Sequence, residues 1–182
     1  YSRFCGIKAS VATDVVQLGI ILLGGALLVT LGLRLTGGLE TVRAGLGSVS
    51  GEYISLTSAS GVEVLLSFGL PTAVGLISGP FGDQCFWQRV FSIREDRIGR
   101  SFLGAAILFT LAPIAMGTIG FLAAGTGFQA EDPGMVNFEF VMSLLPAWVL
   151  VPFLFMVISG LLSTVDSNLC AAASLTTDWM TG

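Results

Sequence analysis

The chain has 182 residues, of which 53% are hydrophobic and only 11% are charged, and its formal net charge is −4. A mean hydropathy of +0.87 excludes a soluble domain, because one core of this size cannot bury so much apolar surface. We therefore predict an all-α integral membrane protein in a lipid bilayer, and the absence of histidine excludes metal sites and catalytic relays built on imidazole.

Four stretches of the chain carry no charged residue and are long enough to cross a bilayer, which takes about 20 apolar residues in a helix. These stretches occupy residues 15–33, 64–82, 101–130 and 140–165. We predict four transmembrane helices with approximate bounds 10–34, 62–88, 100–127 and 143–176.

Basic residues are distributed unevenly around these stretches. Arg34 and Arg43 lie between the first and the second. The other six precede the first stretch or separate the second from the third: Arg3, Lys8, Arg89, Arg94, Arg97 and Arg100. Because Lys and Arg favour the cytoplasmic side, we predict that both ends of the chain face the cytoplasm across a plasma (inner) membrane. The three cysteines then lie at the reducing side, and no disulfide is expected.

The connectors on the opposite side carry turn residues and no chemistry of their own. Residues 36–60 are rich in Gly and Ser, with a weakly amphipathic piece at 39–46. Residues 138–145 are expected to form a short helix on the outer face before Pro146 begins the next span. This segment acts either as a lid or as a passive connection.

The second uncharged stretch is unusually rich in Gly and Pro between Gly69 and Gly82. A broken membrane helix of this kind is tolerated where it lines a cavity, and it indicates a transporter's binding site. A simple proline kink is the alternative. Asp83, Gln84 and Trp87 follow at once and favour a pocket for a small polar organic solute. Alternatively, Asp83 is hydrated at the interface and paired with Arg89.

The fourth stretch ends in a cluster of oxygen-bearing residues. Gly160, Ser163, Thr164 and Ser167 fall on one face of a helix, and Asp166 lies at its edge. A carboxylate inside a membrane is costly and indicates function, and oxygen donors suit a hard cation. The alternative is that these hydroxyls only bond to carbonyls of the preceding turn. The pattern favours a cation-coupled transporter.

Three segments, taken together, resemble the sodium:solute symporter family. They are Gly6-Ile-Lys-Ala-Ser-Val-Ala-Thr13-Asp14-Val-Val-Gln17, Asp83-Gln84-Cys-Phe-Trp-Gln88-Arg89, and Ser163-Thr164-Val-Asp166-Ser167-Asn-Leu169 through Thr177-Asp178. The resemblance implies a leucine-transporter-like bundle of two inverted five-helix repeats. Residues 1–182 are then expected to be a fragment of a single transporter domain that supplies core helices five to eight.

The resemblance also implies roles for individual residues. Ser163 and Thr164 match the hydroxyl pair of the family's shared sodium site, and Gly160 matches its carbonyl donor. A second cation site is implied at Asp14, Asp166 and Ser167, although Asp14 would otherwise pair with Lys8 at the interface. Substrate-binding positions are implied at Asp83, Gln84 and Trp87. Gln88 and Arg89 are expected to be structural residues at the inner gate.

The function expected from this resemblance is secondary active transport, in which sodium influx drives uptake of a small organic solute by alternating access. Sodium is the coupling ion, and no cofactor, nucleic acid or enzymatic activity is expected, because no nucleophile with a neighbouring base is evident. The alternative is a transporter-like sensor domain fused to a signalling module, which sequence beyond Gly182 would reveal.

Overall fold

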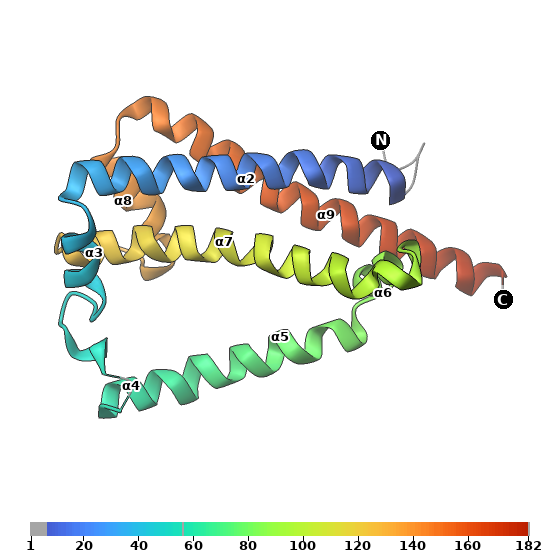
Figure 1. Cartoon of the computed structure of the whole chain (residues 1–182), viewed down its shortest axis with the longest axis horizontal. Coiled ribbons are helices and arrows are strands. Elements are labelled where there is room, and N and C mark those ends of the chain that lie inside the picture. The colour runs from blue at the N-terminus through green and yellow to red at the C-terminus, as the bar shows by residue number, and fades with distance from the viewer. Residues whose placement is uncertain (1–6, 56, 182) are drawn as a thin grey trace.

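The computed structural model of the chain describes residues 7–55 and 57–181. Three long helices lie side by side in it: α2 (Ile7–Thr36), α7 (Ile98–Gly125) and α9 (Leu150–Thr181). A fourth long helical stretch, Ala59–Gly82, lies apart from these three helices and approaches them near α6 (Figure 1). All four are long and apolar enough to cross a membrane, and the described residues contain no strand. The prediction of an all-α membrane protein with four spans is confirmed.

The second span consists of three pieces. It begins at α4 (Ala59–Val64), whose N-cap residue Ser58 accepts a hydrogen bond of 3.0 Å from the Gly61 amide. A π-helical turn, η2 (Leu65–Gly69), follows, and α5 (Leu70–Gly82) completes the span. The helix α5 is continuous, so the loss of helical structure that we expected inside 69–82 is wrong. Pro80 does lie inside α5, as the proline-kink alternative requires, and its missing amide leaves one hydrogen bond of the helix unmade. Pro71 lies in the first turn of α5, and the irregular backbone falls at the two ends of α5, in the π-helical turn η2 and at Asp83.

Asp83 ends the second span. Its backbone is extended, with φ −94° and ψ 108°, and its carboxylate accepts a hydrogen bond of 2.9 Å from the Cys85 amide. The side chain thereby caps a new helix, α6 (Gln84–Ser92). The span therefore stops at Gly82 rather than at residue 88, and α6 is a separate helix that contacts α9.

The hydrophobic core lies towards one end of the bundle. The short helices α3 (Leu39–Gly45) and α8 (Val136–Leu144) close this end. The buried residues here come from α2, α7, α8, α9 and the connection between α8 and α9: Leu28, Ile119, Leu122, Ala123, Phe140, Val141, Leu145, Val149, Phe153 and Met156. The helix α8 overlaps the short helix predicted at 138–145 and begins two residues earlier, whereas α3 forms in the weakly amphipathic piece at 39–46, which was predicted only as part of a connector.

Glycines allow the closest approaches in this core. A Cβ atom on Gly45 of α3 would lie 1.9 Å from the carbonyl oxygen of Phe121 on α7, and one on Gly125 would lie 1.9 Å from the carbonyl of Thr41. Gly37 and Gly38 have φ angles of 98° and 80°, which the sharp turn from α2 into α3 requires.

The short 3-10 turns complete the connections between these helices. They are η1 (Glu52–Ile54), η3 (Glu95–Arg97), η4 (Pro133–Met135) and η5 (Ala147–Val149). The turn η5 follows Pro146, so α9 itself begins at Leu150 rather than at residue 143.

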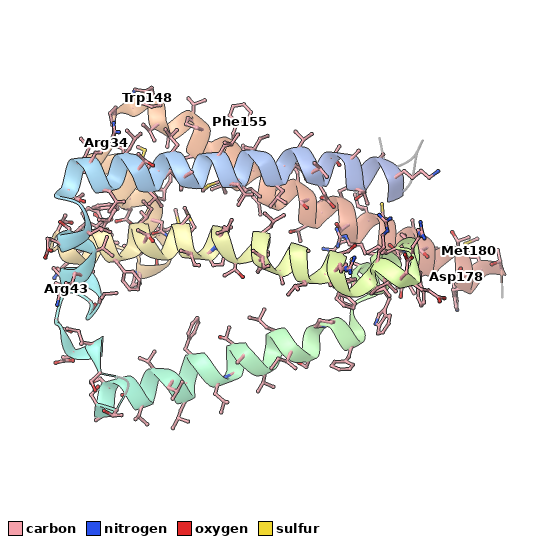
Figure 2. The ribbon with its side chains drawn as sticks, in the orientation of Figure 1. Arg34, Arg43, Trp148, Phe155, Asp178 and Met180 are labelled. Carbon is pink, nitrogen blue, oxygen red and sulfur yellow. The ribbon has the colours of Figure 1, made fainter. Side chains whose placement is uncertain are left out.

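The charged residues are separated along the bundle. Arg34 and Arg43 lie at the end where α2 passes into α3 (Figure 2). The helix α6 lies towards the other end, on the side of Asp178 and the C-terminus (Figures 1 and 2). Arg3, which we expected beside this second group, lies outside the described residues. The end-to-end separation of Arg34 and Arg43 from α6 is the arrangement that the positive-inside pattern requires.

Candidate functional site

A polar cluster lies where α2, α6 and α9 meet, away from the hydrophobic core. Asp14 comes from the second turn of α2, and Ser163 and Ser167 lie one turn apart on α9. The Ser163 hydroxyl donates a hydrogen bond of 2.5 Å to Oδ1 of Asp14. The carboxylate and the serine are 149 positions apart in the chain, so helix packing alone brings them together.

Arg89 on α6 completes the cluster. Its Nη2 atom lies 3.0 Å from Oδ2 of Asp14 and donates a second hydrogen bond of 2.6 Å to the Ser167 hydroxyl. Ser167 in turn donates to the Ser163 carbonyl at 2.9 Å. Asp14, Arg89, Ser167 and Ser163 therefore form a closed ring of hydrogen bonds, which we name the Asp14 ring. Both carboxylate oxygens of Asp14 are engaged in it.

The helix α6 is held against α9 by further side chains on the same face as Arg89. The Cys85 thiol lies 3.4 Å from the Ser167 carbonyl and 3.4 Å from Oδ1 of Asn168. One turn later, Gln88 donates a hydrogen bond of 3.4 Å to the Cys170 carbonyl. Burial first, and then the neighbouring Asp83 carboxylate, raise the pKa of the Cys85 thiol above its ordinary value of 9.0. The thiol is therefore neutral at physiological pH.

A cavity of about 200 Å³ opens beside the Asp14 ring. Its walls are mostly polar and come from α6, α9 and the joint between α5 and α6: Asp83, Cys85, Arg89, Ser163, Thr164, Ser167 and Asn168. The cavity therefore has Asp83, a predicted substrate position, among the same lining residues as Ser163 and Thr164. Its size and lining suit a small polar molecule or a hydrated ion.

The three predicted sodium ligands lie together on α9. The Thr164 hydroxyl donates a hydrogen bond of 3.1 Å to the Gly160 carbonyl, as the alternative reading of these hydroxyls requires. The Ser163 hydroxyl instead donates its hydrogen bond to the Asp14 carboxylate. Gly160 and Thr164 also line an apolar groove of about 430 Å³ between α2, α7 and α9.

The residues predicted for a second cation site are only partly brought together. Asp14 and Ser167 are joined through the Arg89 guanidinium. Asp166 is buried, with 7% of its surface exposed, one position before Ser167 on α9. Two pairings considered from the sequence are wrong, because among the described residues no ion pair joins Asp14 to Lys8 or Asp83 to Arg89.

Gln84 and Trp87, the other predicted substrate positions, are not among the residues that line the cavity. Trp87 is 38% exposed and packs edge-on against Phe86, with ring centroids 5.8 Å apart. Of the three residues predicted to contact substrate, Asp83 alone lines this cavity.

Sequence reasoning did not assign Cys85, Asn168 or Arg89 to the site. Cys85 and Arg89 are four residues apart, which places them on one face of α6, and Asn168 directly follows the serine-rich run on α9. That spacing was visible in the sequence, but the docking of this face onto α9 was not.

The geometry defines an integral membrane protein with a charged, hydroxyl-lined site at one end of a helical bundle. A family model described as the sodium:solute symporter family matches residues 1–180. The chain belongs to the sodium:solute symporter family. Membership of this family implies sodium-coupled transport of a solute across a membrane. Neither the curated proteins nor the solved structures yielded a match.

Proposed function

We propose that the chain carries the ion-coupling part of a secondary transporter that uses sodium influx to drive uptake of a small polar organic solute by alternating access. The observation that supports this most directly is the shared cavity. One wall of it presents the Ser163 and Thr164 hydroxyls, and the same space is bounded by the Asp83 carboxylate. An ion and a solute that bind next to each other have a direct means of affecting each other's affinity.

The proposed sodium ligands are the Ser163 and Thr164 hydroxyls and the Gly160 carbonyl. The Ser163 hydroxyl donates its hydrogen bond to Asp14, so the lone pairs of the Ser163 oxygen remain available to a cation. The Thr164 hydroxyl donates its hydrogen bond to the Gly160 carbonyl, so the lone pairs of the Thr164 oxygen also remain available to a cation. Hydroxyl and carbonyl oxygens are hard donors that bind sodium without the strong attraction of a carboxylate, and such a site can release its ion.

The proposed solute site begins at Asp83, with Gln84 and Trp87 as further contacts. Asp83 interrupts the helical backbone between α5 and α6, and irregular backbone at membrane depth is tolerated where it lines a cavity. The carboxylate favours a solute that offers hydrogen-bond donors or a positive charge. A second cation position is proposed at Asp14, Asp166 and Ser167.

Energy for uptake would come from the membrane potential and the sodium gradient, at about 2.3 kcal/mol per charge for each 100 mV. Sodium binding stabilises one conformation over the other and so shifts the population of outward-open and inward-open states. With the arginine-rich segment 89–100 at the cytoplasmic side of a plasma membrane, α2 would run from the inside to the outside and the Asp14 ring would lie near the inner surface.

The test is uptake by the intact protein in proteoliposomes. Sugars, amino acids, urea and carboxylates are each assayed by counterflow, first with an inward sodium gradient and then with choline in place of sodium. We expect one solute class to accumulate only with sodium. Accumulation that follows a proton gradient in sodium-free buffer would contradict the proposal.

A further inference from the structure

We propose that the cation at the second position is not a second sodium ion but the guanidinium of Arg89, so that the protein binds one sodium ion only. This inference rests on the proposed function, because it concerns the number of ions that drive the transport step. It assigns to Arg89 a role in setting the ion stoichiometry.

The position of the Nη2 atom carries the inference. It lies 3.0 Å from Oδ2 of Asp14 and 2.6 Å from Oγ of Ser167, which are two of the three residues implied for the second cation site. The other oxygen of Asp14 accepts the Ser163 hydroxyl. A guanidinium has only donors and keeps its charge in proteins, so it satisfies these acceptors as a bound cation would.

The charges around this position support the same conclusion. Asp14 is the acidic partner of Arg89, and the Asp83 carboxylate on the adjoining cavity wall is committed to the Cys85 amide. A sodium ion entering between Asp14 and Ser167 would lie against the positive guanidinium and would have to displace it. The charge of Asp14 is already matched by Arg89, so an ion would have to compete with the guanidinium for this carboxylate; the other carboxylates near the position are those of Asp83 and the buried Asp166.

Arg89 is also fixed in place rather than loosely attached. Cys85 and Gln88, on the same face of α6, each contact a backbone carbonyl of α9, at Ser167 and Cys170 respectively. These contacts hold the base of the Arg89 side chain beside the serines. The cation is thus tethered at a fixed distance, and it cannot exchange with sodium from solution while α6 stays on α9.

Removal of the guanidinium should open the position to an ion. In Arg89→Met, the side chain keeps its apolar stem, while Asp14, Ser163 and Ser167 keep their oxygens. We expect the variant to bind two sodium ions. Arg89→Lys retains a tethered charge and should bind one, as the wild type does.

The experiment measures equilibrium binding of radioactive sodium to the purified intact protein, with no solute present. The expected ratios of sodium to protein are one for wild type, two for Arg89→Met and one for Arg89→Lys. The matched control is Arg94→Met, which removes an arginine whose partner is Asp96 on the exposed loop and should leave the ratio at one. Arg89→Gln serves as the second variant if Arg89→Met does not fold, and its expected ratio is also two.

Chemical rescue separates an ionic role from a structural one. Millimolar guanidinium chloride should displace one of the two ions from Arg89→Met, because it restores the missing group, and should displace none from the wild type. A wild-type ratio of two, or a folded Arg89→Met protein that binds one ion, would overturn the inference and leave the proposed function standing. A wild-type protein that binds no sodium would overturn both.

Discussion

Ser163 on α9 donates its hydroxyl proton to Asp14 on α2 across a hydrogen bond of 2.5 Å. The orientation of a proposed sodium ligand therefore depends on a carboxylate from a different helix. Any movement of α2 relative to α9 changes where the Ser163 lone pairs point. The two residues should consequently behave as one unit when each is substituted.

Replacing the hydroxyls of Ser163 or Thr164 should weaken activation of transport by sodium. In Ser163→Ala and Thr164→Ala a ligand oxygen is lost, and we expect the sodium concentration for half-maximal uptake to rise roughly tenfold, which corresponds to about 1.4 kcal/mol. The measurement is initial uptake rate against sodium concentration in proteoliposomes. At saturating sodium, solute should still bind.

Thr176→Ala is the matched control for this prediction. Thr176 also donates its hydroxyl to a carbonyl four residues earlier on α9, at 2.8 Å, but it does not line the cavity. If Thr164→Ala and Thr176→Ala changed sodium dependence equally, the effect would come from the helix bond, and Thr164 would not be a ligand.

Asp14→Asn should impair coupling more than either hydroxyl substitution. It removes the charge that holds Arg89 and weakens the acceptor for Ser163. In a double-mutant cycle with Ser163→Ala, we expect the combined loss to be smaller than the sum of the single losses, because both changes break the same contact. Asp178→Asn, which removes an equal charge near the end of α9, should have no effect. Additive losses from Asp14 and Ser163 would argue that the two residues act separately.

Gly45→Ala should destabilise the packed end of the bundle. The added methyl would lie 1.9 Å from a backbone carbonyl of α7, and the resulting overpacking costs roughly 1–3 kcal/mol. Thermal unfolding in detergent should show a melting temperature several degrees lower. The control is Gly75→Ala on α5, where a Cβ meets nothing within 4 Å and alanine improves helix propensity. A melting temperature unchanged by Gly45→Ala would mean that α3 does not pack on α7 as described.

Thiol reactivity at Cys85 should depend on pH in a defined direction. The thiolate is the reactive form, and the pKa of Cys85 lies above 9.0 because of burial and then the charge of Asp83. Maleimide labelling of a variant with Cys5 and Cys170 replaced by serine should therefore be slow at pH 7 and accelerate up to pH 9 and beyond. Because the folded protein holds this proton more firmly than the unfolded chain, stability should fall as pH rises through that range.

Asp83→Asn tests whether the Asp83 carboxylate contributes to the raised pKa of Cys85. Loss of the carboxylate should lower the Cys85 pKa and speed labelling at pH 8. A labelling rate that levels off below pH 9 in the parent variant, or slower labelling in Asp83→Asn, would contradict this account of the thiol.

Much of the fold was predictable because charge and hydropathy divide the chain sharply. The four spans follow from uncharged stretches, and the short helix α8 follows from a local pattern, whereas α3 was predicted only as part of a connector. The separate helix α6 was not predicted. The density of Gly and Pro suggested a break inside 69–82, whereas the chain leaves the helix at Asp83, whose carboxylate caps the next helix.

The partners of Asp14 and Arg89 were also not predictable from the sequence. Sequence proximity favoured Lys8 for Asp14 and Asp83 for Arg89, whereas the structure joins residues 75 positions apart. Local spacing can place residues on one face of a helix, but it cannot decide which helix packs against that face. The pairing depends on how α2, α6 and α9 assemble.

Asp83 separates two helices with opposite attachments. No residue of α5, which precedes Asp83, is buried against the described part of the chain. The helix α6, which follows Asp83, is attached to α9 by Cys85, Gln88 and Arg89. Two backbone angles at a single extended residue therefore set the direction of a whole membrane-spanning helix. A rotation at this residue would swing α5 as a rigid arm while the Asp14 ring kept its geometry.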